Sequence, residues 1–347
     1  MRSAPGRVNL IGEHTDYAGG LVLPFAIGLR TTATAEANGR DVVRIRSREQ
    51  PDEVVEVHLA DIDDGRVEGW SAYVAGVVAV LRRRGHDVGG TDISVAGDVP
   101  PGAGLASSAA LECAVAATLS DAFALELTDD EIAAVAHAAE NDVVGVPCGV
   151  MDQLVSVHAL AGHALLIDCA TSQLEHIPFE PHAQGFDVLV VDTLVRHSLA
   201  DGAYAERQRW FFEADDDSDV HRRATRHVQS ENERVRAATE ALRSADWQRL
   251  GQLLVASHES LRDNLDVSCP ELELAVETLL RNGAIGARLT GAGFGGSVVG
   301  LVPYTQADAV VAALGDAFGR VGLARPVVRQ VTSGAGLGAE STDSRPT

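Results

Sequence analysis

The order of strand-like and helix-like segments limits the folds that this chain can adopt. Alternating apolar and β-branched residues predict strands at 22–37, 42–46 and 54–59. Helical periodicity follows at 70–84, 107–123 and 128–143, and Thr128 with Glu131 forms a capping box at the start of the last of these helices. Strands return at 164–168 and 187–192 without a regular β-α-β alternation, so the pattern predicts an α+β fold.

The second half of the chain is predicted to be mostly helical from 204 to 281. It then ends in strands at 287–290, 298–302 and 326–331 and a helix at 306–318. A length of 347 residues is enough for two domains. We place them at 1–180 and 181–335. We expect the remaining segment, 336–347, to be a disordered tail, because it is rich in Gly, Ser, Thr and Asp.

All 28 basic residues are arginine, because the chain contains no lysine. P-loop kinases, pyridoxal enzymes and protein kinases each need a lysine at the reacting group, so these classes are excluded. Only 4% of residues are aromatic, and the core must therefore be aliphatic.

The net charge of −22 argues against nucleic acid or an anionic membrane as partner, because the long-range field repels both. Four scattered cysteines, Cys113, Cys148, Cys169 and Cys269, form no zinc motif. The chain begins without an apolar leader, and its most apolar stretch, 72–81, is too short to span a bilayer. We therefore expect a cytoplasmic protein.

A glycine-rich segment at 100–110, PPGAGLASSAA, precedes a predicted helix. Its backbone N–H groups and the helix dipole would attract an anion, and Ser108 could reach Mg²⁺. An ordinary glycine turn before an N-capped helix explains the same letters, so phosphate binding stays one of two readings here.

A second segment, 7–17 (RVNLIGEHTDY), crowds one cation, two carboxylates and an imidazole between glycines. Carboxylates accept pairs of sugar hydroxyls, and Arg7 could balance their charge or face a transferring phosphoryl group. A surface turn with self-paired charges is the alternative for this cluster taken alone.

Two further acidic residues stand in apolar or small surroundings, Asp152 within 148–153 and Glu140 at the end of an alanine-rich helix. Helix capping or a surface position explains either residue when taken alone. The segment GAGFGG at 291–296 fits a dinucleotide fingerprint by letter, but an apolar, strand-like run follows it where that fingerprint needs a helix. We therefore reject a nicotinamide site and expect either close backbone approach or a tight hairpin.

Together these segments resemble the three motifs of the GHMP small-molecule kinases, and 6–17 resembles the galactokinase signature of that family. Further similar stretches lie at 147–153, 195–199, 226–234 and 258–271, so the resemblance spans nearly the whole chain. It implies an N-terminal ribosomal-S5-like domain, a C-terminal ferredoxin-like domain and an active site between them.

The resemblance also implies the site residues. Asp152 would be the catalytic base toward the anomeric hydroxyl of D-galactose, and Arg7 would stabilise the transition state. The residues that would hold the sugar are Glu13, His14, Thr15, Asp16, Gly149 and Tyr204. The residues that would bind the ATP phosphates are Gly102, Ala103, Gly104, Leu105, Ala106, Ser107 and Ser108. Ser108 with Glu140 would coordinate Mg²⁺.

Simple electrostatics supports these roles in part. An arginine beside Asp152 favours the ionised carboxylate, so Asp152 would orient the hydroxyl more than it abstracts the proton. The sequence also departs from the family pattern. Its first motif begins almost at Met1 and the segment after Tyr204 is short, so we expect an incomplete N-terminal sheet and a shortened helical region.

The resemblance leaves three functions open. The first is galactokinase, giving galactose 1-phosphate. The second is a related sugar kinase acting on N-acetylgalactosamine, galacturonate or arabinose. The third is a galactose sensor or a degenerate relative with weak catalysis. The unbroken segments 13–17 and 107–110, with Arg7 and Asp152 both present, favour the first.

Overall fold

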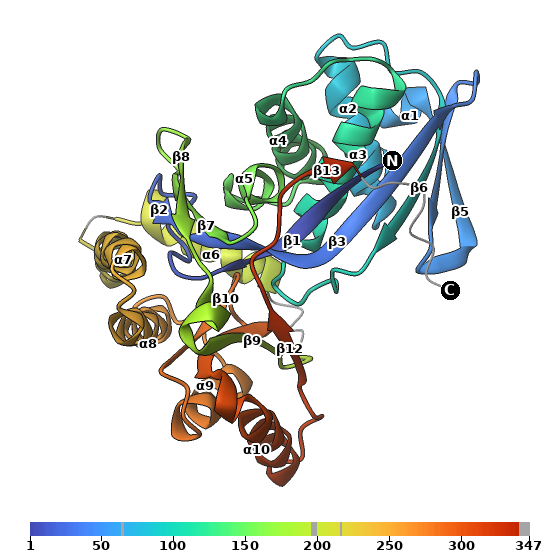
Figure 1. The fold of residues 1–347 in the computed structure, drawn as a ribbon. Helices are drawn as coiled ribbons and strands as arrows, with labels where there is room; N and C mark the ends of the chain where they lie inside the picture. Colours follow the sequence, from blue (N-terminus) through green and yellow to red (C-terminus); the bar gives the residue numbers. More distant parts are fainter. Residues whose placement is uncertain (64–65, 196–199, 216, 340–347) are drawn as a thin grey trace.

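A computed structural model describes residues 1–63, 66–195, 200–215 and 217–339 (Figure 1). The strands are β1 (Arg2–Asn9), β2 (Leu21–Val22), β3 (Pro24–Ala37), β4 (Val42–Ser47), β5 (Gln50–His58), β6 (Thr91–Gly97), β7 (His163–Asp168), β8 (Gln173–Pro178), β9 (Phe186–Asp192), β10 (Gly286–Thr290), β11 (Ser297–Pro303), β12 (Val327–Val331) and β13 (Gly338–Ala339). The helices are α1 (Leu59–Asp63), α2 (Ser71–Arg83), α3 (Ser107–Ala122), α4 (Asp129–Ala138), α5 (Met151–His158), α6 (Ala200–Phe212), α7 (Asp219–Arg243), α8 (Trp247–Asp263), α9 (Pro270–Arg281) and α10 (Ala307–Arg320). A π-helical segment spans Ala139–Val144, and short 3₁₀ turns span Pro181–Gln184 and Tyr304–Gln306.

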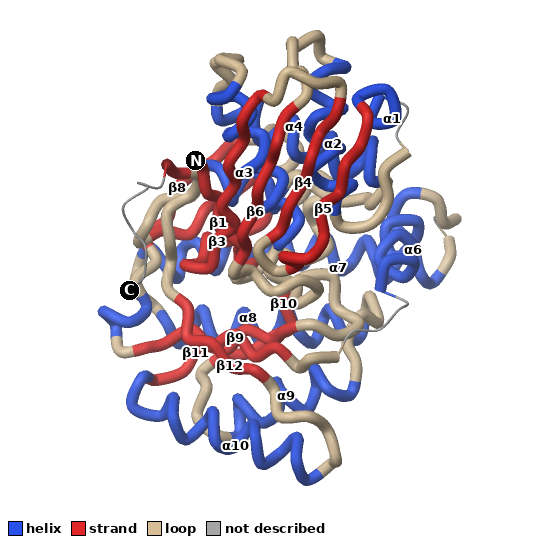
Figure 2. The backbone as a smooth tube through the Cα atoms, turned by 90° about the vertical axis from the view of Figure 1, so that its right-hand side faces the viewer, coloured by secondary structure: helices blue, strands red, loops and turns tan. Residues whose placement is uncertain are grey.

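The N-terminal lobe is built on a six-stranded sheet with the order β13-β1-β3-β6-β4-β5. Its neighbouring strands are antiparallel except β4 and β6, which are parallel. Helices α2, α3 and α4 cover one face of the sheet, and Figure 2 shows the strands in front of these helices. Ile45 and Ile93 of the sheet pack in one core with Val77, Leu81 and Leu119 of the helices. All five side chains are aliphatic, as the composition predicts.

The C-terminal lobe is built on a four-stranded antiparallel sheet with the order β10-β11-β9-β12. Leu189 and Leu289 of this sheet share a core with Leu279 of α9 and with Leu314 and Phe318 of α10. In Figure 1 these helices lie below the sheet, on the side away from the N-terminal lobe.

A second apolar core joins the lobes. Val8 and Phe25 from the N-terminal sheet pack in one cluster with Val190, Val299 and Leu254 from the C-terminal lobe. A smaller sheet, β2-β7-β8, lies beside this junction. Because the buried contact is continuous, the end of β1 and the end of β10 are held next to each other by packing.

The α+β prediction is confirmed, and each predicted helix is present within a few residues of its expected bounds. Two differences have physical causes. The predicted strand 22–37 divides at Leu23, because Leu23 exchanges backbone hydrogen bonds with Leu10 and Ile11 while β2 pairs with β7. The predicted helix 128–143 begins with the expected Thr128 capping box, and its winding changes from α to π at Ala139.

The remaining differences are elements that the pattern did not predict. Strand β1 was missed because Pro5 and Gly6 break the alternation, and the pairing with β3 shifts register between Pro5 and Arg7. Strands β6 and β8 and helix α5 were missed as well. The expectation of a disordered tail from 336 is corrected for its first residues. Gly336 and Leu337 donate backbone hydrogen bonds to Ala159 and Val157, and β13 pairs with β1. The rest of the predicted tail, 340–347, lies outside the described residues.

Candidate active site

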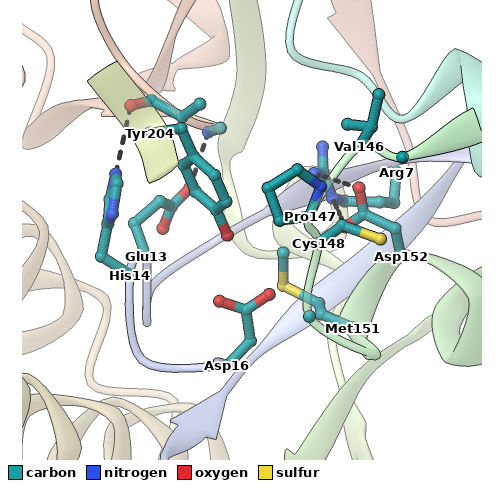
Figure 3. Close-up of a pocket in the computed structure, with 14 residues that line it drawn as sticks. Arg7, Glu13, His14, Asp16, Val146, Pro147, Cys148, Met151, Asp152 and Tyr204 are labelled. Atoms are coloured by element: carbon teal, nitrogen blue, oxygen red, sulfur yellow. Dashed lines mark hydrogen bonds and ion pairs between the residues drawn. The ribbon is translucent and has the colours of Figure 1, made fainter. Parts of the chain in front are cut away.

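Two cavities meet at the junction of the lobes, and Figure 3 shows the first of them. Cavity A, with a volume of about 370 Å³, is lined by Arg7, Glu13, His14, Asp16, Gly145, Val146, Pro147, Cys148, Gly149, Met151, Asp152, Tyr204, Gly291 and Ala292. Cavity B, of about 430 Å³, is lined by Arg7, Gly102, Gly104, Leu105, Ala106, Ser107, Ser108, Asp152, Val195, Thr290 and the residues 291–296. Arg7, Asp152, Gly291 and Ala292 line both cavities and therefore mark the boundary between them.

An arginine and an aspartate face each other at this boundary. Arg7 comes from β1 and Asp152 from the first turn of α5. The guanidinium donates Nε to Oδ1 and Nη2 to Oδ2 of Asp152, both at 2.8 Å, and Nη1 to the carbonyl of Gly104 at 2.6 Å. Arg7 is 5% exposed, whereas the Asp152 side chain is 22% exposed. The carboxylate thus stays accessible to a ligand while the arginine is locked in place.

Asp16 projects into cavity A opposite Tyr204 and Met151 (Figure 3). Burial, reinforced by the nearby Asp152 charge, raises the pKa of Asp16 to about 6. Gly149 makes room for this carboxylate, because a Cβ at position 149 would lie 2.0 Å from Oδ2 of Asp16. Asp16 is therefore a carboxylate aimed into a cavity, ready to accept hydroxyl hydrogen bonds.

His14 lines cavity A, and its backbone adopts the left-handed conformation, with φ of 59°. Burial lowers its pKa to about 3, so the ring is neutral. Its Nε2 lies 3.1 Å from the carbonyl of Ala292, which can only accept, and Nδ1 lies 3.2 Å from the hydroxyl of Tyr17. Nε2 therefore carries the hydrogen, and Nδ1 accepts from Tyr17. Both nitrogens are used within the protein, so His14 shapes the cavity and holds the 291–292 backbone.

Thr15 does not line either cavity, which corrects the expectation that it contacts the sugar. It is fully buried, and its hydroxyl lies 2.8 Å from the carbonyls of both Gly12 and Leu21. Thr15 therefore stabilises the turn that carries His14 and Asp16.

The glycine loop lines cavity B, as the phosphate-binding interpretation predicts. Ala106 adopts a left-handed backbone with φ of 58°, and no side chain caps the first turn of α3. The free N–H groups of this turn therefore point at the cavity. Ala103 is the exception among the predicted residues, because it is fully buried and its carbonyl accepts from Ser297 at 2.7 Å.

The expected close backbone approach at 291–296 and the hairpin are both present. β10 and β11 pair from Gly286 to Thr290, and a Cβ at Gly291 would lie 3.2 Å from Cα of Gly104. The 291–296 segment therefore packs directly on the glycine loop at 102–108, and a side chain at either glycine would crowd the facing backbone.

Acidic side chains lie behind the first turn of α3. Among the described residues no group of three or more His, Cys, Asp or Glu side chains is arranged as a metal site. Glu140 is buried in the π-helical segment and accepts from Gln153 at 2.8 Å, and the nearby Ser108 hydroxyl favours its ionised form. Mg²⁺ commonly takes one or two protein ligands and completes its shell with water and phosphate, so this pair fits the ion.

Glu112 is a buried acid that sequence reasoning missed. It is fully buried in α3 beside Glu140, and both of its carboxyl oxygens lack a partner. Burial raises the pKa of Glu112 well above the usual range and also raises the pKa of Glu140, whose ionised form Ser108 favours, so Glu112 is the neutral member of the pair. The available signal was a single acid within the apolar run 109–117 of the predicted helix.

Three family models match the chain. They are the GHMP kinases N-terminal domain over 72–159, the galactokinase galactose-binding signature over 1–37 and the GHMP kinases C-terminal domain over 238–320. A galactokinase from Streptomyces coelicolor is 42% identical over 96% of this chain and 92% of its own length. The chain belongs to the galactokinase family.

Other galactokinases extend the comparison. One from Thermococcus kodakarensis is 41% identical over 88% of this chain and 90% of its own length. The solved galactokinase from Lactococcus lactis, in complex with galactose, superposes with a TM-score of 0.89 at 31% identity. That match covers 97% of this chain and 94% of the solved chain. A mevalonate kinase from Methanococcus jannaschii, at 22% identity and a TM-score of 0.75, shares the fold.

Membership of the galactokinase family agrees with the α+β architecture and with both predicted GHMP domains. In the described residues no helix is long and apolar enough to cross a membrane. Of the predicted stretch 195–199, residues 196–199 lie outside the described residues, whereas Tyr204 lines cavity A.

Proposed function

We propose that this protein transfers the γ-phosphoryl group of ATP to the anomeric hydroxyl of D-galactose, giving galactose 1-phosphate and ADP. The observation that carries the proposal is the Arg7–Asp152 pair, which stands at the boundary of the two cavities. Cavity A offers carboxylates suited to a polyol, and cavity B offers backbone N–H groups suited to phosphates. The reacting atoms would therefore meet beside this pair.

Galactose would occupy cavity A. The Asp16 carboxylate, which cavity A places opposite Tyr204, accepts two sugar hydroxyls, and Tyr204 closes that side of the ring. Asp152 accepts the hydrogen of the anomeric hydroxyl and orients that oxygen toward cavity B. Arg7 holds the Asp152 carboxylate in position and faces the phosphoryl group during its transfer.

The ATP phosphates would occupy cavity B, held by the 102–108 loop and by the first turn of α3. Mg²⁺, held by Ser108 and Glu140, would neutralise phosphate charge. A protein with a net charge of −22 and no lysine needs such local neutralisation. Arg7 would neutralise phosphate charge on the side that faces the sugar.

A third cavity of about 420 Å³ continues from cavity B and shares Gly102, Ser107 and Ser108 with it. Its walls include Trp70 and Tyr73. An aromatic wall next to the cavity assigned to the phosphates suits a purine base, so we assign the adenine of ATP to this cavity.

The domain bounds 1–180 and 181–335 also remain part of the proposal, and they are supported by β9, which begins at Phe186 and pairs with strands of the C-terminal sheet. A cytoplasmic location is supported by the cysteines, all four of which are free.

The proposed function is tested by incubating the purified protein with ATP, Mg²⁺ and D-galactose and measuring ADP and sugar 1-phosphate together. We expect equal amounts of both products. N-acetylgalactosamine, galacturonate and arabinose serve as comparison sugars. A clear preference for one of them would replace galactose as the substrate, and galactose binding without any product would support the sensor instead.

The affinity for galactose should depend on pH through Asp16. Since the pKa of Asp16 is raised to about 6, the ionised form that accepts two hydroxyls disappears below that pH. We expect galactose to bind roughly tenfold more weakly at pH 5 than at pH 7, because one pKa unit corresponds to a factor of ten. Calorimetric titration across pH 5–8 measures this effect.

The matched control for this pH effect is Asp16→Asn, which should bind galactose weakly and with a flat pH profile.

The stability of the fold gives an independent readout of the protonation of Asp16. A raised pKa in the folded state means that Asp16 contributes stability below pH 4, and that this contribution is lost as the pH rises through 6. Asp16→Asn should therefore melt at a higher temperature than the parent at pH 8, and a steep pH profile in this variant would contradict the assignment.

The Gly149→Ala substitution should raise KM for galactose about tenfold or more. The added methyl group would occupy space used by the Asp16 carboxylate, so Asp16 must turn away from the sugar. KM for ATP should stay within about twofold, because Gly149 does not line cavity B. Gly145→Ala is the control. Gly145 lines the same cavity, but the space around its Cβ position is open, so an effect of this substitution reports backbone strain at the positive φ of Gly145 and not a clash with Asp16. An unchanged KM for galactose in Gly149→Ala would show that Asp16 does not contact the sugar.

A further inference from the structure

A buried polar cluster connects the end of β1 with the end of β10, and we name its members Asn9, Glu13, Arg288 and Thr290 the Glu13 cluster. Oε1 of Glu13 accepts from the Thr290 hydroxyl and from the Gly291 N–H, both at 3.0 Å. Oε2 accepts from Nδ2 of Asn9 at 2.8 Å and from Arg288. Four donors thus surround one carboxylate, two of them from side chains of the C-terminal lobe.

Arg288 is the centre of this connection. It is fully buried on β10, forms an ion pair with Glu13, and donates Nη1 to the carbonyls of Asn9 and Leu10, each at 3.1 Å. Buried ion pairs add little net stability, because desolvation offsets the attraction. The planar guanidinium of Arg288 does fix the orientation of its partners, because it holds three acceptors at set angles. The positioning of its hydrogen-bond partners therefore explains a buried Arg288 better than stabilisation of the fold does.

The residues that the cluster holds line both cavities. Glu13 fixes the N–H of Gly291, and His14 fixes the carbonyl of Ala292. Gly291 in turn packs on Gly104, whose carbonyl accepts from Arg7. A shift of the 291–292 backbone would therefore change the wall of cavity A and the phosphate loop of cavity B together.

We propose that Arg288 is a positioning residue that couples galactose binding to nucleotide binding, by holding Glu13 and, through it, the shared 291–292 wall. This inference rests on the proposed function, because it requires the two ligands assigned to the two cavities. Because the cluster holds the wall as one unit, a displacement that a ligand imposes on it in one cavity is passed to the other cavity. Arg288 itself touches neither cavity.

The test measures the Kd of galactose by calorimetry with and without a non-hydrolysable ATP analogue and Mg²⁺. In the parent we expect galactose to bind about tenfold more tightly when the nucleotide is present, within the usual range of coupling. In Arg288→Lys the charge remains but the fork is lost, and we expect this factor to fall below about twofold. The Kd for galactose alone should change much less than the coupling factor, which a general loss of structure would not produce.

A second pair of variants keeps the test decisive if Arg288→Lys does not fold. Thr290→Val removes one donor to Glu13 at constant shape, whereas Thr290→Ser retains the hydroxyl. We expect Thr290→Val to lose part of the coupling and Thr290→Ser to keep it. Arg82→Lys is the matched control, because Arg82 binds Asp63 by two hydrogen bonds away from both cavities.

The outcomes separate this inference from the proposed function. A parent that forms galactose 1-phosphate but shows no coupling would overturn the role of Arg288 and leave the kinase intact. Full coupling in Arg288→Lys or in Thr290→Val would overturn it as well. A parent that neither binds nor phosphorylates galactose would refute the proposed function, and this inference with it.

Discussion

Replacement of Asp152 by asparagine is expected to lower kcat for galactose phosphorylation by about 10³-fold, with KM for galactose within about fivefold of the parent. Asparagine keeps the size of the side chain but cannot receive the proton of the anomeric hydroxyl. It also loses one of the two charge-assisted bonds to Arg7, so the guanidinium is less firmly placed. Steady-state kinetics with coupled detection of ADP measures both constants.

Asp121→Asn is the matched control for this substitution. Asp121 also binds an arginine of β1, Arg2, through two hydrogen bonds of 2.7 and 2.9 Å, but this pair is partly exposed and lies outside both cavities. We expect its kcat to equal that of the parent. A normal kcat in Asp152→Asn would remove Asp152 from the reaction, whereas equal losses in both variants would indicate a general structural effect.

Loss of Arg7 should also act on kcat more than on KM. We expect about a 10³-fold lower kcat in Arg7→Met, because the transferring phosphoryl group loses the cation that faces it, and a smaller loss of about 10²-fold in Arg7→Lys. Lysine keeps the charge, but its single ammonium cannot bind both Asp152 oxygens and the Gly104 carbonyl in the same geometry. Single-turnover measurements separate the chemical step from binding.

The control for Arg7 lies on the same strand. Arg2→Lys changes the same kind of two-bond pair away from the cavities, so its kcat should not change. A variant of Arg7 with normal kcat and a raised KM would assign Arg7 to ground-state binding and contradict the role proposed here.

Much of the fold could be predicted from periodicity. Helices α2, α3 and α4 bury long apolar faces, and the Thr128 capping box marks where α4 begins. Strand β1 could not be predicted in this way, because Pro5, Gly6 and Arg7 are unusual in a strand and their roles depend on distant partners. Arg7 reaches Asp152 across 145 positions of the chain.

The candidate site residues come from short segments with unusual residue chemistry. Arg7, Glu13, His14 and Asp16 of the 7–17 cluster line cavity A, and the 102–108 loop lines cavity B except for the buried Ala103, whereas Thr15 is buried. Arg288 and Glu112 had no local pattern around them. Their significance arises from neighbours that only folding brings together.

The sequence alone determined which chemistry is available, because it lacks lysine and contains a glycine loop before a helix and one segment dense in charged and imidazole side chains. It also determined the α+β class through the order of its periodic segments. The tertiary structure decided which of those side chains face the cavity. Glu13 and His14 are turned toward the third motif, whereas Asp16 is left aimed into the cavity. The physical reason is that a polar group in a folded interior is committed to whichever partner packing brings within hydrogen-bond reach, and local sequence does not encode that distance.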